Sequence, residues 1–392
     1  GALFQSDSAL IDGQRRRTKK EQAHGEPLEL PTKILCMTLA PTGRDATASR
    51  EDEVPYAYVG GANHAARKVN LKTGKTTKLY QGHAGPVTSV AVFRRPAPSD
   101  AAAEEECLLT GSWDKTLRAW NAQTKEVLVT MRGHTDFIKA VAIGKDHLIE
   151  GATTRHPRTA YSVSADGTAR RWDLATGACL CVYEGEHRGQ VESVAVTHLD
   201  GVREWLWTAG TDGTVRRWDA VTGACVAILS GHLTSVFAVH TPPNSDGAAE
   251  LWSASADKTV RRWDLDTHDE DTVLEHPDAV RCVGLVGPYA VTGSRDEHVR
   301  VFNIAASSLQ ATIVGHYDEV TAVEMHAGIL YTASLDCTIR RWSLAGNGKF
   351  AQQEEDQTLA ETKEDSNLAT PADRPGLMTE EEERELAELM SD

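Results

Sequence analysis

Three residue types that can cooperate in nucleophilic catalysis recur in a fixed order along this chain. A histidine precedes a serine or threonine, and an aspartate follows that hydroxyl residue four positions later. Six copies are present, with histidines His83, His134, His187, His232, His276 and His316, hydroxyls Thr110, Ser162, Thr208, Ser253, Thr292 and Thr332, and aspartates Asp114, Asp166, Asp212, Asp257, Asp296 and Asp336. Such a set could activate a hydroxyl for attack on a carbonyl carbon, and repeated histidines could bind a metal ion.

The number of copies argues against both chemistries. One catalytic triad is enough for a hydrolase, whereas six similar sets are explained by six similar structural units. Each copy also supplies its own aspartate and hydroxyl alongside the histidine, so we do not expect the histidines to bind a metal. The glycines form neither a GxxxxGK[ST] loop nor a GxGxxG turn after a strand. We therefore predict no catalytic, cofactor-binding or metal-binding residue and no cofactor, and we expect that the protein is not an enzyme.

A large aromatic residue completes each copy, six positions after the aspartate. These residues are Trp120, Trp172, Trp218, Trp263, Phe302 and Trp342. The aspartates recur at intervals close to the ~40–45 residues of a four-stranded propeller unit. Short alternating segments rich in β-branched residues, such as VTSVAVF (87–93) and VESVAVT (191–197), predict strands, and Asp-Gly and Thr-Gly pairs predict the turns between them.

These motifs resemble those of the WD-repeat family, over residues 33–345. The segments GSWDKTLRAWN, SADGTARRWD, GTDGTVRRWD and SADKTVRRWD carry the resemblance. It implies an all-β fold, a seven-bladed β-propeller with four antiparallel strands per blade. It also implies that the histidine, hydroxyl, aspartate and tryptophan of each copy form a hydrogen-bonded structural network within one blade. The first blade departs from the pattern, with Val59, Asn63 and Val69 at three network positions and Leu30 near the histidine position.

Two segments could supply the last strand of the ring. KFAQ (349–352) would continue the chain, whereas PLEL (27–30) would add an N-terminal strand to the last blade, which is the family's usual device. The expected domains are a flexible tail (1–26) with the basic run QRRRTKK (14–20), the propeller (27–351), an acidic polar linker (352–376) and an acidic amphipathic helix (377–392).

Charge and cysteine content narrow the classes of partner. The net charge is −16, and residues 352–392 hold 14 acidic and 3 basic side chains, so the remainder is mildly acidic and we expect no direct nucleic-acid binding. No apolar run approaches the ~18 residues of a membrane span. Seven scattered cysteines without metal-ligand spacing indicate reduced thiols in a cytoplasmic or nuclear protein.

Residues that differ between copies are the candidates for recognition. Five large side chains occupy turn positions without a network role: Trp113, Phe137, Arg295, Tyr317 and Leu335. We predict that they bind a peptide or small domain on the face formed by the histidine loops and aspartate turns. The alternative is that they cap the ends of the sheets.

Two further features are ambiguous. An Arg-Arg-Trp triplet occurs four times, and its arginines either pair with local acidic groups or form a basic band on the outer wall. Long polar stretches, among them RRPAPSDAAAEEE (94–106) and EGATTRHPRT (150–159), are expected as surface loops rather than binding sites.

These observations together favour a non-catalytic scaffold or adaptor in a multiprotein complex, monomeric outside it. Two alternatives are a substrate-recognition adaptor of a ubiquitin ligase and an assembly or regulatory factor of ribonucleoprotein complexes. The Trp-Asp-x-Arg/Lys motif of ligase adaptors is absent, since Ala175, Val221 and Asp266 stand where its basic residue would be.

Overall fold

A computed structural model of the chain describes residues 17–20, 24–40, 55–97, 100–144, 146–148, 155–197, 203–242 and 250–343. The chain divides into two units, residues 1–351 and 352–392. The second unit, which includes the expected linker and helix, lies outside the described residues, and all that follows concerns the first. No helix in the described ranges is long and apolar enough to cross a lipid bilayer.

The first three blades follow one another along the chain, each as an antiparallel sheet. Blade one contains β2 (Ile34–Leu39), β3 (Tyr56–Gly61), β4 (Ala65–Asn70) and β5 (Thr76–Gln81). Blade two contains β6 (Val87–Ala97), β7 (Asp100–Ser112), β8 (Thr116–Asn121) and β9 (Val127–Arg132). Blade three contains β10 (Ile138–Ile143), β13 (Thr159–Ser164), β14 (Ala169–Asp173) and β15 (Cys179–Tyr183).

The remaining blades repeat this order. Blade four contains β16 (Val191–Thr197), β17 (Trp205–Gly210), β18 (Thr214–Asp219) and β19 (Cys225–Ser230). Blade five contains β20 (Val236–His240), β21 (Glu250–Ser255), β22 (Thr259–Asp264) and β23 (Glu270–Glu275). Blade six contains β24 (Val280–Val286), β25 (Tyr289–Ser294), β26 (Val299–Asn303) and β27 (Ser308–Ile313). Blade seven contains β28 (Val320–His326), β29 (Ile329–Ser334), β30 (Thr338–Ser343) and β1 (Leu28–Glu29).

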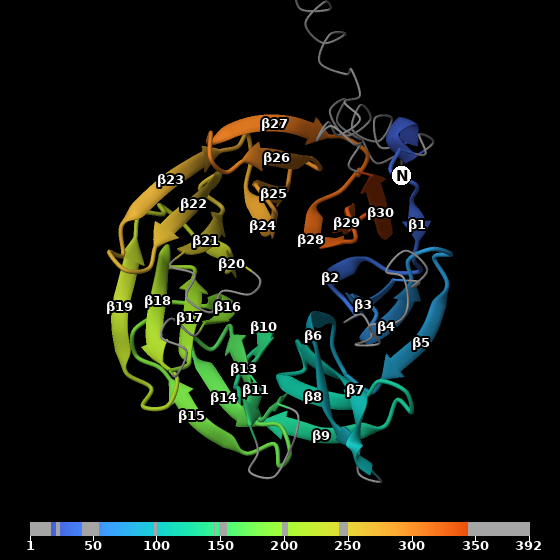
Figure 1. Cartoon of the computed structure of the whole chain (residues 1–392), viewed down its shortest axis with the longest axis vertical. Coiled ribbons are helices and arrows are strands. Elements are labelled where there is room, and N and C mark those ends of the chain that lie inside the picture. The colour runs from blue at the N-terminus through green and yellow to red at the C-terminus, as the bar shows by residue number, and fades with distance from the viewer. Residues whose placement is uncertain are drawn as a thin grey trace, which may run out of the picture. The chain divides into compact units, whose positions relative to one another are not determined.

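The seven sheets form a ring, so the predicted seven-bladed propeller is confirmed (Figure 1). The first strand of each blade lies next to the central channel and the fourth lies on the outer wall (Figure 1). In blade seven the outer strand is β1, where Leu28 pairs with Ile339 and Glu29 with Thr338. The N-terminal candidate for the closing strand is therefore the correct one, and it covers the edge of β30 that would otherwise have no partner strand.

Two of the expected loops contain strands. The segment 94–106, expected as a polar loop, extends the hairpin of β6 and β7, with Arg94 opposite Glu106 and Arg95 opposite Glu105. Opposite charges that face each other across the two strands stabilise this extension. Composition alone does not show this cross-strand pairing. In the segment 150–159, β12 (Arg155–Pro157) pairs with β11 (Asp146–Leu148) as a separate two-stranded ribbon.

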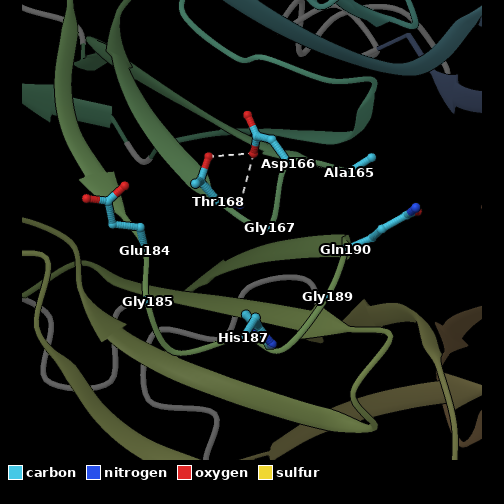
Figure 2. Close-up of a pocket in the computed structure, with 9 residues that line it drawn as sticks. All are labelled: Ala165, Asp166, Gly167, Thr168, Glu184, Gly185, His187, Gly189 and Gln190. Carbon is cyan, nitrogen blue, oxygen red and sulfur yellow. Dashed lines mark hydrogen bonds between the residues drawn. The ribbon is translucent and has the colours of Figure 1, made fainter.

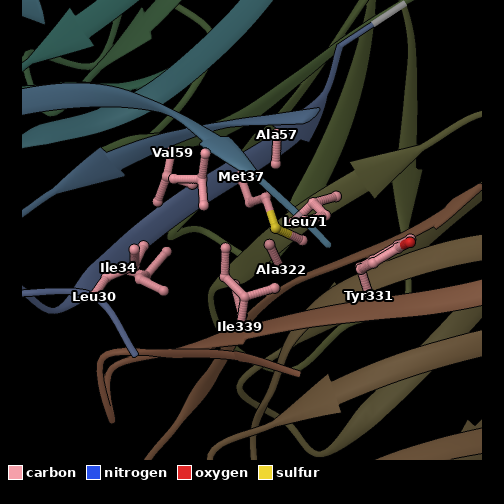
Figure 3. Close-up of a cluster of buried hydrophobic side chains, with 11 residues drawn as sticks. Leu30, Ile34, Met37, Ala57, Val59, Leu71, Ala322, Tyr331 and Ile339 are labelled. Atoms are coloured by element: carbon pink, nitrogen blue, oxygen red, sulfur yellow. The ribbon is translucent and has the colours of Figure 1, made fainter. Parts of the chain in front are cut away.

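The hydrophobic core lies between blades rather than within them. Each buried cluster combines residues from two neighbouring sheets, as at the junction of blades seven and one. There Leu30, Ile34 and Met37 pack against Ile339 and Ala322, residues from opposite ends of the chain (Figure 3). A single blade cannot bury its two apolar faces alone, so the ring must be complete before the core is complete.

Candidate protein-interaction surface

The histidine, hydroxyl, aspartate and tryptophan of blade three form one continuous hydrogen-bonded chain. Trp172 Nε1 donates to Ser162 Oγ at 2.8 Å, and the same oxygen lies 2.8 Å from His134 Nε2. On the other side of the ring, His134 Nδ1 lies 2.8 Å from Asp166 Oδ2. The corresponding contacts occur in four more blades, through His83–Thr110–Asp114–Trp120, His187–Thr208–Asp212–Trp218, His232–Ser253–Asp257–Trp263 and His316–Thr332–Asp336–Trp342.

Burial and charge fix the protonation of this network. Burial lowers the pKa of His134 despite the nearby Asp166, so the imidazole is neutral at pH 7. Burial alone would raise the pKa of Asp166, but hydrogen bonds from His134, Thr168 and the Thr135 amide outweigh it and hold that pKa well below its ordinary value. Neutral His134 therefore donates from Nδ1 to the carboxylate and accepts the Ser162 proton at Nε2, since Ser162 Oγ already accepts the indole N–H.

The arrangement has the connectivity of a catalytic triad without access for a substrate. Ser162 is fully buried, with 0% of its surface exposed, and so are its equivalents in the other networks, Thr110, Thr208, Ser253 and Thr332. Each hydroxyl is enclosed between the sheets, so it cannot reach a carbonyl group arriving from solvent. The network instead connects the loop before the first strand to the turn between the second and third strands, and it satisfies their buried polar groups.

Blade six departs from the predicted network. Asp296 does not bond His276; its carboxylate pairs with Arg300 at 2.6 Å, and His276 Nδ1 lies 3.1 Å from the Leu274 carbonyl oxygen. His276 keeps only its contact with Thr292, at 2.8 Å. The loop is one residue shorter there, and Phe302 has no N–H to donate to Thr292. In blade one, where no network was expected, Asn63 Oδ1 accepts a hydrogen bond from Arg67 at 3.0 Å.

The second arginine of each Arg-Arg-Trp triplet has a local partner. Arg262 pairs with Glu250 at 2.6 Å and Asp271 at 3.0 Å, and Arg341 pairs with Glu26 of the N-terminal segment. Arg217 lies over the Trp205 ring at 3.9 Å, and Arg171 donates to the Ala220 carbonyl oxygen at 3.4 Å. These contacts favour local pairing over a free basic band.

The face formed by the histidine loops and aspartate turns exposes one aromatic pair. Trp113 follows β7 and Phe137 precedes β10, and their rings stack with centroids 5.0 Å apart and an interplanar angle of 18°. Trp113 is 43% exposed and Phe137 39% exposed. Two of the five candidate recognition residues, from neighbouring blades, therefore form one apolar surface.

The other three candidates lie apart from this pair, on blades six and seven. Arg295 forms a bidentate ion pair with Asp278, at 2.9 and 3.1 Å. Tyr317 is half-buried and donates to the Asp336 carbonyl oxygen at 2.9 Å, and Leu335 is also half-buried. The contacts of Arg295 and Tyr317 stabilise the turns in which these residues lie.

A pocket opens on the same face, between blades three and four. Its volume is about 580 Å³, and its walls are Ala165–Thr168 from one turn and residues between Glu184 and Gln190 from one loop (Figure 2). Asp166 and Glu184 contribute carboxylates, whereas Gly167, Gly185 and Gly189 contribute only backbone. The Ala165 amide donates to the Phe137 carbonyl oxygen at 2.9 Å, which joins this pocket to the aromatic pair.

Comparison with known proteins agrees with this architecture. The family described as "WD domain, G-beta repeat" matches residues 74–121, 223–264 and 307–343. An uncharacterized WD repeat-containing protein of Schizosaccharomyces pombe is 31% identical over 399 residues, covering 100% of this chain and 98% of that protein. The chain belongs to the WD-repeat family.

More distant relatives match different fractions of this WD-repeat protein. A ribosome biogenesis protein WDR12 homolog of Trichoplax adhaerens is 26% identical over 198 residues, 45% of this chain and 43% of that protein. Human striatin-3 is 25% identical over 282 residues, 68% of this chain but 28% of its own length. WD-repeat proteins generally act as interaction scaffolds.

Sequence reasoning missed several residues that complete the WD-repeat turns. A threonine two positions after the aspartate bonds to it in five blades, as Thr168 Oγ1 does to Asp166 Oδ1 at 2.7 Å. Four arginines were recognised from the sequence as the first of an Arg-Arg-Trp triplet, but not the wider pattern, in which an arginine stands four positions after the aspartate, or after Asn63 in blade one, in all seven blades: Arg67, Arg118, Arg170, Arg216, Arg261, Arg300 and Arg340. The constant distance of the threonine and of the arginine from the aspartate is visible in the sequence and could have identified both. Leu233, 85% exposed on the same face, was also missed.

Proposed function

We propose that this WD-repeat protein is a non-catalytic protein–protein interaction scaffold, whose partner binds across the face of histidine loops and aspartate turns. The exposed Trp113–Phe137 stack carries the proposal. Aromatic side chains supply large contact area at low entropic cost and are enriched among the residues that dominate binding energy. Both rings are held by structured turns, because the Trp113 amide donates to the Pro86 carbonyl oxygen at 3.0 Å and the Ala165 amide anchors Phe137.

The charges around the channel mouth favour a protein partner over a nucleic acid. Lys139 pairs with Glu192 at 3.1 Å, and Arg281 pairs with Glu319 at 2.5 Å while lying 4.2 Å from the Phe237 ring centroid. Neutralised cations of this kind do not form the basic stripe that a phosphate backbone requires. The protein would act in the cytoplasm, the nucleus or both, as a monomer outside its complex.

The test is quantitative affinity purification with the full chain as bait. Trp113→Ala/Phe137→Ala should lose the specifically recovered partners. The matched control Val226→Ala/Ile228→Ala removes two apolar side chains of similar exposure, 50% and 48%, from the outer strand β19. The control should retain the partners. Equal recovery with both double variants would place the binding surface elsewhere.

A second candidate is a factor in ribonucleoprotein assembly. The name of the WDR12 homolog, which describes ribosome biogenesis, favours it. Under this reading the protein would bind a protein component of the particle. Nuclease treatment before purification should then leave ribosomal proteins associated with the wild-type bait and not with Trp113→Ala/Phe137→Ala.

A further inference from the structure

We propose that the pocket between blades three and four binds an arginine or lysine side chain of the same partner that covers the Trp113–Phe137 stack. This inference rests on the proposed function and adds the chemical class of the partner: a peptide segment with a basic residue close to an apolar one. Four features of the described residues support it.

The pocket results from one additional residue in a single loop. In the loops that enter blades two, three, five and seven, the histidine is the third residue after the last buried residue of the preceding outer strand, as His83 is after Tyr80. In the loop that enters blade four, His187 is the fourth residue after Tyr183, and Glu186 is the additional residue. In four of the other loops the residue before the histidine is a glycine packed against the arginine and tryptophan of the blade, as Gly133 is against Arg170 and Trp172. The insertion moves the loop away from that contact.

Glycines keep the walls of the pocket open. Gly185 has no heavy atom within 4 Å of the position a Cβ would occupy, and its φ is +85°. Gly189 has a φ of +135°, and a Cβ there would lie 2.4 Å from Thr211 Oγ1. A side chain at either position would be strained by the backbone conformation, so the loop leaves a space bounded largely by main chain.

The lining presents negative charge without a compensating cation. Asp166 remains ionised because four donors hold its carboxylate: His134 Nδ1, the Thr135 and Thr168 amides, and Thr168 Oγ1. Glu184 is exposed. Glu186 pairs with Arg216 at 3.2 Å, and the Arg188 side chain is not part of the lining. His187 offers no free donor, since its ring nitrogens lie 3.1 Å from Asp212 and 2.7 Å from Thr208.

These constraints select a basic side chain rather than a metal ion. The Asp166 oxygens already accept two hydrogen bonds each, so this carboxylate acts through its charge and not as a ligand. Glu184 provides the direct acceptor, and a guanidinium or ammonium group can bond to it while the side-chain stem lies along the glycine backbone. The Ala165–Phe137 hydrogen bond joins the wall of the pocket to the Trp113–Phe137 stack, so one peptide can place a basic residue in the pocket and an apolar residue on the stack.

The experiment is selection of a random peptide display library on the full-length protein, followed by affinity measurements on the selected peptides. Wild type should enrich peptides with arginine or lysine near an aromatic or aliphatic residue. Glu184→Gln should weaken a selected peptide about tenfold, and raised salt should weaken wild type more than Glu184→Gln, which keeps only the Asp166 charge, because the interaction depends on opposite charges. Glu275→Gln is the matched control, since Glu275 is exposed at the end of β23 and, like Glu184, directly follows the last buried residue of its outer strand, and it should leave affinity unchanged.

The outcomes separate the two proposals. If Trp113→Ala abolishes binding while Glu184→Gln does not change it, or if the selected peptides lack basic residues, the stack binds the partner and the pocket proposal is wrong. An equal loss with Glu184→Gln and Glu275→Gln also overturns it, because the effect is then general electrostatics. If no peptide is enriched, or if Trp113→Ala leaves binding intact, the proposed function fails at its first step.

Discussion

Arg300 holds the carboxylate of Asp296 in a two-pronged ion pair, with Nη2 2.6 Å from Oδ2 and Nη1 3.1 Å from Oδ1. In five other blades the corresponding aspartate bonds a histidine. In blade six, Arg300 therefore takes the place of the histidine as the partner of the turn aspartate. His276 makes no hydrogen bond to Asp296.

Replacing the histidine should therefore cost less stability in blade six than in blade seven. His316→Ala removes a partner from the buried Asp336 and from Thr332, whereas His276→Ala leaves the Asp296–Arg300 pair intact. The difference in unfolding free energy should be about 1–3 kcal/mol, the cost of a buried polar group without its partner. Urea unfolding of both variants measures it, and equal midpoints would contradict the independence of blade six.

Stability should fall as the pH is lowered from 7 to 4. Burial, with a contribution from Arg300, lowers the pKa of His276 to about 4. As the pH falls below about 6.5, His276 is therefore protonated in the unfolded chain but stays neutral in the folded chain. The unfolded state is therefore favoured progressively across this interval, by up to about 3 kcal/mol for this residue. His276→Gln cannot titrate and should show a shallower pH dependence in urea unfolding. An unchanged slope would mean that His276 is protonated in the fold.

Leu30 should be important for closing the ring. It is 6% exposed and packs with Ile34 and Ile339 at the junction of blades seven and one. Leu30→Ala should reduce stability by about 2–5 kcal/mol and speed proteolysis of the N-terminal segment. Leu309→Ala, at a 50% exposed position on β27, is the control and should stay within about 0.5 kcal/mol of wild type. Thermal unfolding compares the two, and similar losses would argue against a special role for the junction.

The two classes of tryptophan should differ in their effect on stability. Trp172 is fully buried and bonds Ser162, so Trp172→Ala should cost about 3–5 kcal/mol. Trp113 is exposed and contacts chiefly Phe137, so Trp113→Ala should cost about 0.5–1.5 kcal/mol. Denaturant unfolding checks this, and a large loss for Trp113→Ala would show that the stack is structural rather than a recognition surface.

The cysteines should alkylate in order of burial. Burial raises the pKa of Cys36 and Cys282 to about 12, so their reactive thiolate is scarce at pH 8. Cys179 is exposed on β15 and should react first with iodoacetamide. Mass spectrometry of the native protein should find Cys179 modified, with Cys36, Cys282 and the fully buried Cys107 intact until denaturant is added. Early labelling of Cys36 would reveal opening of blade one.

The repeated residues predicted the architecture because local hydrogen bonds fix them in the same way in five of the seven blades. The hydroxyl residue, the aspartate and the aromatic residue keep a constant spacing because the turn between them is built in the same way, and the histidine keeps its place in the order, so the pattern is visible in the chain. The recognition surface was less predictable. Trp113 and Phe137 come from different blades, and only the packing of neighbouring sheets brings their rings to 5.0 Å.

The pocket could not be predicted for a related reason. One inserted residue, Glu186, leaves the strand pattern unchanged, and its effect depends on the path of a glycine-containing loop between two sheets. The exchange of partners in blade six was likewise hidden, because the histidine and aspartate are both present and only the loop length alters what they reach.

The pairing of Leu28 with Ile339 has a consequence for protein synthesis. The closing strand leaves the ribosome before its partner, which follows about 310 residues later. At about 5–20 residues per second, β1 waits roughly 15 to 60 seconds for β30 to be made. During that interval the apolar side chains of blade one that pack against blade seven in the finished ring have no neighbour and stay exposed.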